Sequence, residues 1–247
     1  MIGGQVVIMD NSSHSGKVDF AIAKKAGIDG VIIRMIVVGR TYDAAYFTNW
    51  ANSSNHFSIR GIYVNAGTII QCQNTLDEID KQFPVKFPPL GIWVAIELQI
   101  TGNFNNGLWL ASQLATRNRG IVGIYSAKWV QDRDDKAHLF PELGNFPLWV
   151  AHYARVKNPL LPSYWTVYDL WQYSADGNNR GGEFGQTSDD ADLSVFWGTQ
   201  DAFFKWVGFN PEKDTLFPIY KDSTTLMDLG NLLYDPTVHL FYKKDAK

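Results

Sequence analysis

The stretch Gly91-Ile-Trp-Val-Ala-Ile-Glu-Leu-Gln99 decides the fold of this chain. Its apolar run, Ile92 to Ile96, follows the turn signal Pro88-Pro89 and predicts a buried strand that ends at Glu97. Strand side chains alternate between faces, so Ala95 and Glu97 should point the same way, roughly 6.6 Å apart. A carboxylate at the carboxyl end of a buried strand is where barrel enzymes carry their chemistry.

Working outward, buried strands alternate with amphipathic helices. Asp19 is expected to cap a helix, Thr75 and Glu78 to form a capping box for a helix reaching Phe83, and Gly120 to end a helix that carries Leu108. The other expected strands are Gln5–Met9, Val31–Ile36, Gly61–Asn65, Ile121–Tyr125, Leu148–Ala151 and Asp169–Tyr173. Seven or more strands at this length favour a closed barrel. Because the second half is poorer in helices, we expect an α/β fold of the irregular TIM-like (β/α) barrel type.

The pattern changes after Gly198. We expect residues 1–207 to form the barrel and residues 208–247 a short C-terminal extension, which could contact a protein partner. The extension carries two apolar runs and a candidate helix: Leu216–Tyr220, Val238–Tyr242 and Thr224–Leu233. Whether it packs on the barrel or begins a second module stays open.

Composition excludes several classes of function. The 247 residues carry a net charge of −3 without a long run of one sign, so neither nucleic acid nor an anionic membrane is an expected partner. The longest apolar stretch, Val31–Val38, is broken by Arg34 and is too short to span a membrane. The first five residues do not resemble a signal peptide. Aromatic residues make up 14% of the chain, and flat rings suit both a core and a sugar-binding site.

Carboxylates are the strongest candidates for chemistry. The five histidines are scattered without the spacing of a metal site, the glycine pairs lack nucleotide-binding spacing, and Cys72 has no activating context, so we expect no metal and no cofactor. Asp10 ends the first strand, Glu97 ends the fourth, and Asp192 lies near the end of the barrel region. If the barrel closes, these acids share one end, and paired acids are the usual machinery for cutting glycosidic bonds.

Seven segments in the same order resemble the family 25 glycoside hydrolases, which are lysozymes (N-acetylmuramidases) common among phage endolysins and bacterial autolysins. They are Asp10–Gly16, Ala26–Arg34, Tyr46–Ala51, Ile124–Trp129, Leu148–Tyr153, Leu170–Ser174 and Asp190–Phe196. The resemblance implies an irregular barrel that cleaves the β-1,4 bond after N-acetylmuramic acid without a cofactor. It implies Glu97 as general acid, with Asp10 and Asp192 holding substrate and tuning that acid. The residues it places on the substrate are Arg34, Tyr63, Asn65, Tyr125, Trp149, Tyr153 and Trp171.

Three departures from the family pattern bear on activity. The family's fourth strand ends in Asp-x-Glu, and Ala95 stands where the first acid would be. Met35–Gly39 replaces Ala-Thr-Glu-Gly, and Tyr63-Val-Asn65 replaces Tyr-His-Phe. Either an engineered inactivation or natural drift would explain Ala95. Two hypotheses follow: a muramidase weakened by the loss of one carboxylate, or a catalytically inactive barrel that binds wall glycan or a protein partner.

The resemblance also implies a place of action, the bacterial cell wall, with peptidoglycan or a related glycan as partner. Without a visible signal peptide, the chain would reach the wall by lysis, as part of a virion, or after removal of a signal.

Overall fold

Eight strands close into a barrel in this computed structural model, which describes residues 6–154, 156–175, 179–210, 232–235 and 240–243. In order around the ring they are β1 (Val7–Asn11), β2 (Gly30–Val38), β4 (Arg60–Asn65), β5 (Ile92–Ala95), β6 (Val122–Ser126), β7 (Leu148–Ala151), β8 (Leu170–Ser174) and β9 (Asp192–Phe196). The short β3 (Thr41–Tyr42) pairs with β2 outside the ring. The closed ring confirms the expected irregular β/α barrel.

The irregularity lies in β9, which runs antiparallel to both of its neighbours, β1 and β8. The other neighbouring pairs in the ring are parallel. An antiparallel strand begins at the end where its parallel neighbours finish. Asp192, the first residue of β9, therefore pairs with Asp10 near the end of β1. The sequence did not predict this strand, although it did predict that these two acids meet.

The inner face of the barrel follows from strand alternation. Large apolar side chains fill the interior: Ile8, Ile32, Trp93, Trp149, Leu170 and Phe196. Helix α6 (Gln200–Trp206) follows β9 and adds Phe203 to the same cluster. Because β9 runs antiparallel, α6 covers the amino-terminal end of the parallel strands. The carboxyl-terminal end is left for polar side chains.

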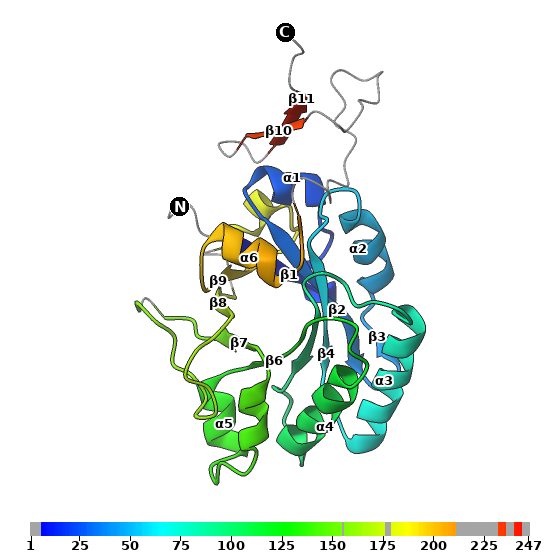
Figure 1. Ribbon diagram of the computed structural model, residues 1–247, viewed down its shortest axis with the longest axis vertical. Coiled ribbons are helices and arrows are strands. Elements are labelled where there is room, and N and C mark those ends of the chain that lie inside the picture. The colour runs from blue at the N-terminus through cyan, green and yellow to red at the C-terminus, as the bar shows by residue number, and fades with distance from the viewer. Residues whose placement is uncertain (1–5, 155, 176–178, 211–231, 236–239, 244–247) are drawn as a thin grey trace.

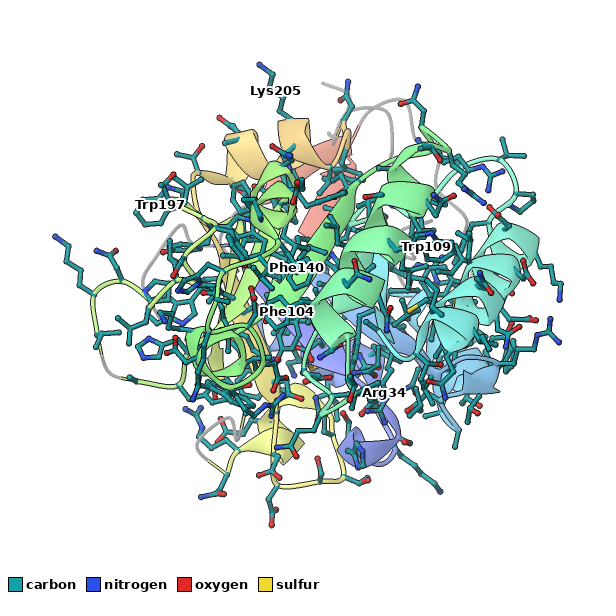
Figure 2. The ribbon with its side chains drawn as sticks, turned by 90° about the horizontal axis from the view of Figure 1, so that it is seen from below. Arg34, Phe104, Trp109, Phe140, Trp197 and Lys205 are labelled. Carbon is teal, nitrogen blue, oxygen red and sulfur yellow. The ribbon has the colours of Figure 1, made fainter. Side chains whose placement is uncertain are left out.

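Helices cover the outside of the barrel. After α1 (Phe20–Lys25), helices α2 (Tyr46–Ser53), α3 (Ile69–Gln82) and α4 (Asn103–Ala115) pack along the β2, β4 and β5 side (Figure 1). Helix α5 (Lys128–Asp134) follows β6, and three short 3-10 helices lie at η1 (Ser13–Ser15), η2 (Pro141–Asn145) and η3 (Gly181–Phe184). Figure 2 shows Phe104 of α4 beside Phe140, with ring centroids 6.3 Å apart. No helix in the described ranges is long and apolar enough to cross a membrane.

Two helix boundaries differ from the sequence prediction. The expected capping box at Thr75 and Glu78 is wrong: α3 begins a full turn or more earlier, where Thr68 accepts from the N–H of Gln71. Thr75 is buried within the helix, and its hydroxyl donates to the carbonyl of Gly39 at 3.0 Å. The helix expected to run to Gly120 ends at Ala115. Asp19 does cap α1, as predicted.

The C-terminal extension is described only in part. Strands β10 (Leu232–Asp235) and β11 (Leu240–Lys243) pair antiparallel. The candidate helix Thr224–Leu233 is wrong at its last two residues, which belong to β10, and its other residues lie outside the described ranges, as does Leu216–Tyr220. At the expected boundary, Val207 is buried, and Phe209, the second residue of the expected extension, packs against the barrel's interior cluster. The ordered core therefore reaches at least to Phe209.

Gly123 provides a test of the interior packing. It pairs with Trp93, and a Cβ at this position would lie 2.3 Å from the Trp93 ring, which is fully buried. Gly123→Ala should therefore lower the free energy of unfolding by about 1–3 kcal/mol through overpacking. Gly182→Ala is the matched control, because nothing lies within 4 Å of its added Cβ. Equal thermal stabilities of the two variants would contradict the described packing.

Candidate active site

Three acids gather at the carboxyl end of the barrel. Asp10 and Asp192 are partners across β1 and β9, and Glu97 lies two residues beyond the end of β5. The strand at Glu97 is thus shorter than expected, ending at Ala95. Asp10 is buried with 4% of its surface exposed, whereas Glu97 and Asp192 are half-buried. The acids predicted from the sequence do come together.

Burial is the largest influence on the pKa of all three carboxyl groups. It raises the pKa of Glu97, against a hydrogen bond from Asn65 and the positive charge of Arg34, which both lower it. Burial also raises the pKa of Asp10, with further increases from Asp192 and Glu97 and a decrease from its bond with Gln172. The pKa of Asp192 rises to about 7 through burial and the charges of Asp190 and Glu97. Burial, reinforced by like charges at Asp10 and Asp192, therefore favours the protonated form of each acid more than water would.

Two side-chain amides each donate a hydrogen bond to one of these acids. Asn65 Nδ2, on β4, donates to Glu97 Oε1 at 2.5 Å. Gln172 Nε2, on β8, donates to Asp10 Oδ2 at 2.8 Å. The hydroxyls of Tyr125 and Tyr153 donate to Gln172 Oε1 at 2.8 and 2.6 Å, which fixes the orientation of that amide. Gln172 lies in Leu170–Ser174, one of the seven segments that carry the family resemblance, but the sequence did not single it out.

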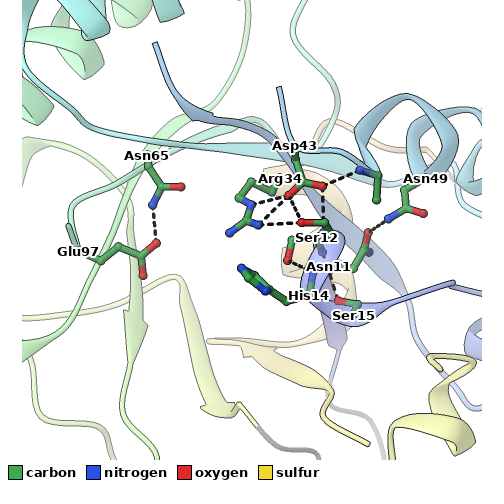
Figure 3. Close-up of polar contacts among 11 residues, drawn as sticks. Asn11, Ser12, His14, Ser15, Arg34, Asp43, Asn49, Asn65 and Glu97 are labelled. Carbon is green, nitrogen blue, oxygen red and sulfur yellow. Dashed lines mark hydrogen bonds and ion pairs between the residues drawn. The ribbon is translucent and has the colours of Figure 1, made fainter. Parts of the chain in front are cut away.

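Arg34 is held by a carboxylate that the sequence analysis missed. Asp43 is buried and pairs with Arg34 Nη2 at 2.7 Å and Nε at 2.8 Å. Burial would raise the pKa of Asp43, but hydrogen bonds from the backbone N–H groups of Ala45 and Ser13, and from Arg34, together lower it. Figure 3 shows this cluster on one side and Glu97 with Asn65 on the other. No sequence motif marked Asp43, because its partners lie on separate elements.

The other candidate substrate-binding residues divide into two groups. Tyr63 and Tyr125 are half-buried at the same end as the acids, and Tyr153 is 52% exposed beside them. Trp149 is only 1% exposed, and its ring packs beneath Tyr63 and Tyr125 at centroid distances of 6.1 and 4.6 Å. Trp149 thus supports the two tyrosines from below.

Trp171 lies away from the acids, contrary to its predicted role as a residue of the site. Its neighbours on β8, Leu170 and Gln172, point into the barrel, so Trp171 points outward. It packs in the outer layer against Tyr168 and Tyr173, and its Nε1 donates to the carbonyl of His152. Strand alternation around Gln172 was the signal that could have excluded it.

Arg133 of α5 also reaches the site. Its Nη2 donates to the backbone carbonyl of Glu97 at 3.0 Å, and its guanidinium lies over the ring of Trp129 at 5.2 Å.

Among the described residues, no group of three or more His, Cys, Asp or Glu side chains could hold a metal ion. The side chains at this end of the barrel offer carboxyl groups, amides, tyrosine hydroxyls and the guanidinium of Arg34.

Solved structures share this fold. A bacterial lysozyme from Streptomyces coelicolor matches with a TM-score of 0.68 and 20% identity, over 85% of this chain and 100% of the other. A family 25 glycosyl hydrolase from Bacillus anthracis matches with a TM-score of 0.67 and 16% identity, over 83% and 95%. The CTP1L endolysin matches with a TM-score of 0.61 and 23% identity, over 82% and 69%. Neither a protein-family model nor a curated protein matches the sequence. This chain thus has the barrel fold of these lysozymes.

The pKa of Asp192 makes a prediction about stability. In the unfolded chain an aspartate has a pKa of about 4, whereas in the folded protein the pKa of Asp192 is about 7. Between these values the unfolded state binds fewer protons, so stability falls as pH rises. Asp192→Asn should remove this contribution, and its melting temperature should fall less than the parent's between pH 5 and 8.

The control for that experiment is Asp201→Asn, an exposed aspartate on α6. It should keep the parent's pH dependence. A parent whose melting temperature rises steadily from pH 5 to 8, with Asp192→Asn running parallel to it, would contradict the raised pKa.

Proposed function

We propose that this chain is a peptidoglycan-acting glycoside hydrolase of the lysozyme type. It would cleave the β-1,4 bond between N-acetylmuramic acid and N-acetylglucosamine in the bacterial cell wall. The observation that carries the proposal is Glu97: a half-buried carboxyl group with a raised pKa at the carboxyl end of the barrel. The shared fold with structures of lysozymes and an endolysin supports the choice of substrate.

Glu97 acts as the general acid in this proposal. Burial keeps its proton available closer to neutral pH, and the proton passes to the oxygen of the glycosidic bond as that bond breaks. Positive charge then develops at the anomeric carbon. Asp10 and Asp192 are the carboxyl groups near enough to Glu97 to affect its surroundings, and either one in its ionised form would stabilise that charge.

The half-buried and exposed tyrosines supply the substrate contacts. Tyr63, Tyr125 and Tyr153 present rings and hydroxyls beside the acids. Such groups suit a sugar, which has an apolar ring face and a hydroxylated edge. Arg34 adds a positive charge that would attract the carboxylate of a muramic acid side chain, although Asp43 neutralises it in part.

Glu97→Gln tests the general acid directly. The amide keeps the shape of the side chain but has no acidic proton, so hydrolysis of purified peptidoglycan should fall by about 10²- to 10⁴-fold. Binding to insoluble peptidoglycan in a sedimentation assay should stay near the parent's. Glu142→Gln, an exposed glutamate in η2, is the control and should keep the parent's rate. Undiminished hydrolysis by Glu97→Gln would remove Glu97 from the mechanism.

A second candidate function rests on Ala95. This residue is fully buried between its register partners Asn65 and Tyr125, so no carboxylate stands on the inner face two residues before Glu97. A barrel that lacks this acid could retain its ligand contacts without turnover. The second candidate is therefore a catalytically inactive barrel that binds wall glycan, with residues 208–247 as a candidate surface for a protein partner.

Ala95→Asp separates the two candidates. An aspartate would add negative charge beside Glu97, raise the pKa of Glu97 by like-charge repulsion, and stabilise positive charge at the anomeric carbon. Initial rates on purified peptidoglycan should rise by about 10²-fold or more. Ala95→Asn introduces a side chain of the same size as aspartate but without its charge, and it should show no such gain. If Ala95→Asp is folded and binds glycan yet gains nothing, the glycan-binding candidate is favoured.

A further inference from the structure

Asn65 donates a hydrogen bond to the carboxyl group of Glu97. It lies at the end of β4 with 3% of its surface exposed, and its Nδ2 donates to Glu97 Oε1 at 2.5 Å (Figure 3). Glu97 itself lies beyond the last residue of β5, so strand pairing does not fix its side chain. The hydrogen bond to Asn65 therefore links a residue outside the strand to the rigid wall of the barrel.

The small side chain of Ala95 makes room for this contact. Asn65 and Ala95 are register partners, and neighbouring strands lie about 4.8 Å apart. A methyl group at position 95 leaves the inner face between Asn65 and Tyr125 without another polar group. The amide of Asn65 consequently turns toward the carboxyl group two residues further along the chain, at Glu97.

The Gln172–Asp10 pair provides a comparison within the same site. There, two tyrosine hydroxyls occupy the amide oxygen and leave only the NH₂ group for the acid. The pair Asn65–Glu97 repeats this amide-to-carboxyl contact on the opposite part of the ring. An amide that donates to a carboxyl oxygen stabilises the ionised form and fixes the direction of the group.

We propose that Asn65 is a positioning residue for Glu97, whose amide holds the carboxyl group in one orientation and stabilises its ionised form against burial. This inference rests on the proposed function, because it gives Asn65 its role through the general acid. A hydrolase needs both forms of that acid, since the proton given to the leaving group must be regained. The hydrogen bond from Asn65 offsets part of the free energy that it costs to bury the ionised carboxylate of Glu97.

Other charged and titratable groups also face Glu97, and they stay unchanged when Asn65 is replaced. They are Asp10 from β1, Arg34 from β2, Tyr63 from β4, Tyr125 from β6, Tyr153 after β7, and Asp192 from β9. Arg133 from α5 also contacts Glu97, through its backbone carbonyl. A change in the titration of Glu97 on substitution of Asn65 is thus a measure of the amide's own contribution.

Titration of Glu97 tests the proposal without any need for turnover. In protein labelled with ¹³C at the glutamate carboxyl carbon, the Glu97 signal is identified by its loss in Glu97→Gln. Asn65→Leu should raise the titration midpoint of Glu97 by about one pH unit, because the ionised form loses its donor. Asn65→Ser keeps a shorter donor, so its midpoint should lie between those of the parent and Asn65→Leu.

The control for a general loss of stability is Thr75→Val. This variant loses the buried hydrogen bond from the Thr75 hydroxyl on α3 to the carbonyl of Gly39, and it leaves the contact between Asn65 and Glu97 in place. It should leave the midpoint unchanged. An unchanged or lowered midpoint in Asn65→Leu would overturn the proposal; if that variant does not fold, a midpoint in Asn65→Ser equal to or below the parent's does the same.

Hydrolysis provides the second readout. The pH above which kcat/KM declines should move upward with the titration midpoint in Asn65→Leu, which a purely structural role would not produce. If the parent shows no hydrolysis, the proposed function fails while the carboxyl titration still decides the role of Asn65. If hydrolysis is present but the midpoint does not move, the role of Asn65 fails and the proposed function stands.

Discussion

The pairing of β9 with β1 is the constraint on which the rest of the structure depends. It closes the barrel with an antiparallel strand and sets Asp192 opposite Asp10. It also directs the chain toward α6, whose Phe203 joins the interior cluster of apolar side chains. One end of the barrel is thereby filled with large apolar side chains, and the other gathers three buried or half-buried acids. Closure and the chemistry of the site have the same structural origin.

Burial of several carboxyl groups in one place has a free-energy cost that the site reduces by different means. Hydrogen bonds from the amides of Gln172 and Asn65 stabilise the ionised forms of Asp10 and Glu97. Arg34 supplies positive charge, and Asp43 keeps it in place. The remaining cost appears as raised pKa values, and the raised pKa of Glu97 suits the role of general acid that we propose for it.

The sequence predicted the features that depend on local pattern. Apolar runs marked the parallel strands, and Asp10 and Glu97 were placed together because parallel strands end on one side of a barrel. Asp192 was placed with them from its position near the end of the barrel region, although its antiparallel strand β9 was not predicted. Prediction from the sequence failed where the contact that decides a residue's role is made with a residue remote in the sequence. Thr75 looked like a cap, but its hydroxyl bonds to Gly39, and Asp43 carried no motif because its partners come from elsewhere. Trp171 was misplaced because the resemblance identified its segment without the direction of its side chain.

The function that we propose for this barrel is cleavage of the bond after N-acetylmuramic acid. The most direct measurement is digestion of purified peptidoglycan by the parent protein, followed by reduction of the new chain ends and mass analysis of the released fragments. If the barrel hydrolyses this bond, the released fragments should carry reduced muramic acid at their ends. Intact glycan strands, with the protein recovered on the sedimented walls, would contradict hydrolysis and leave a barrel that only binds.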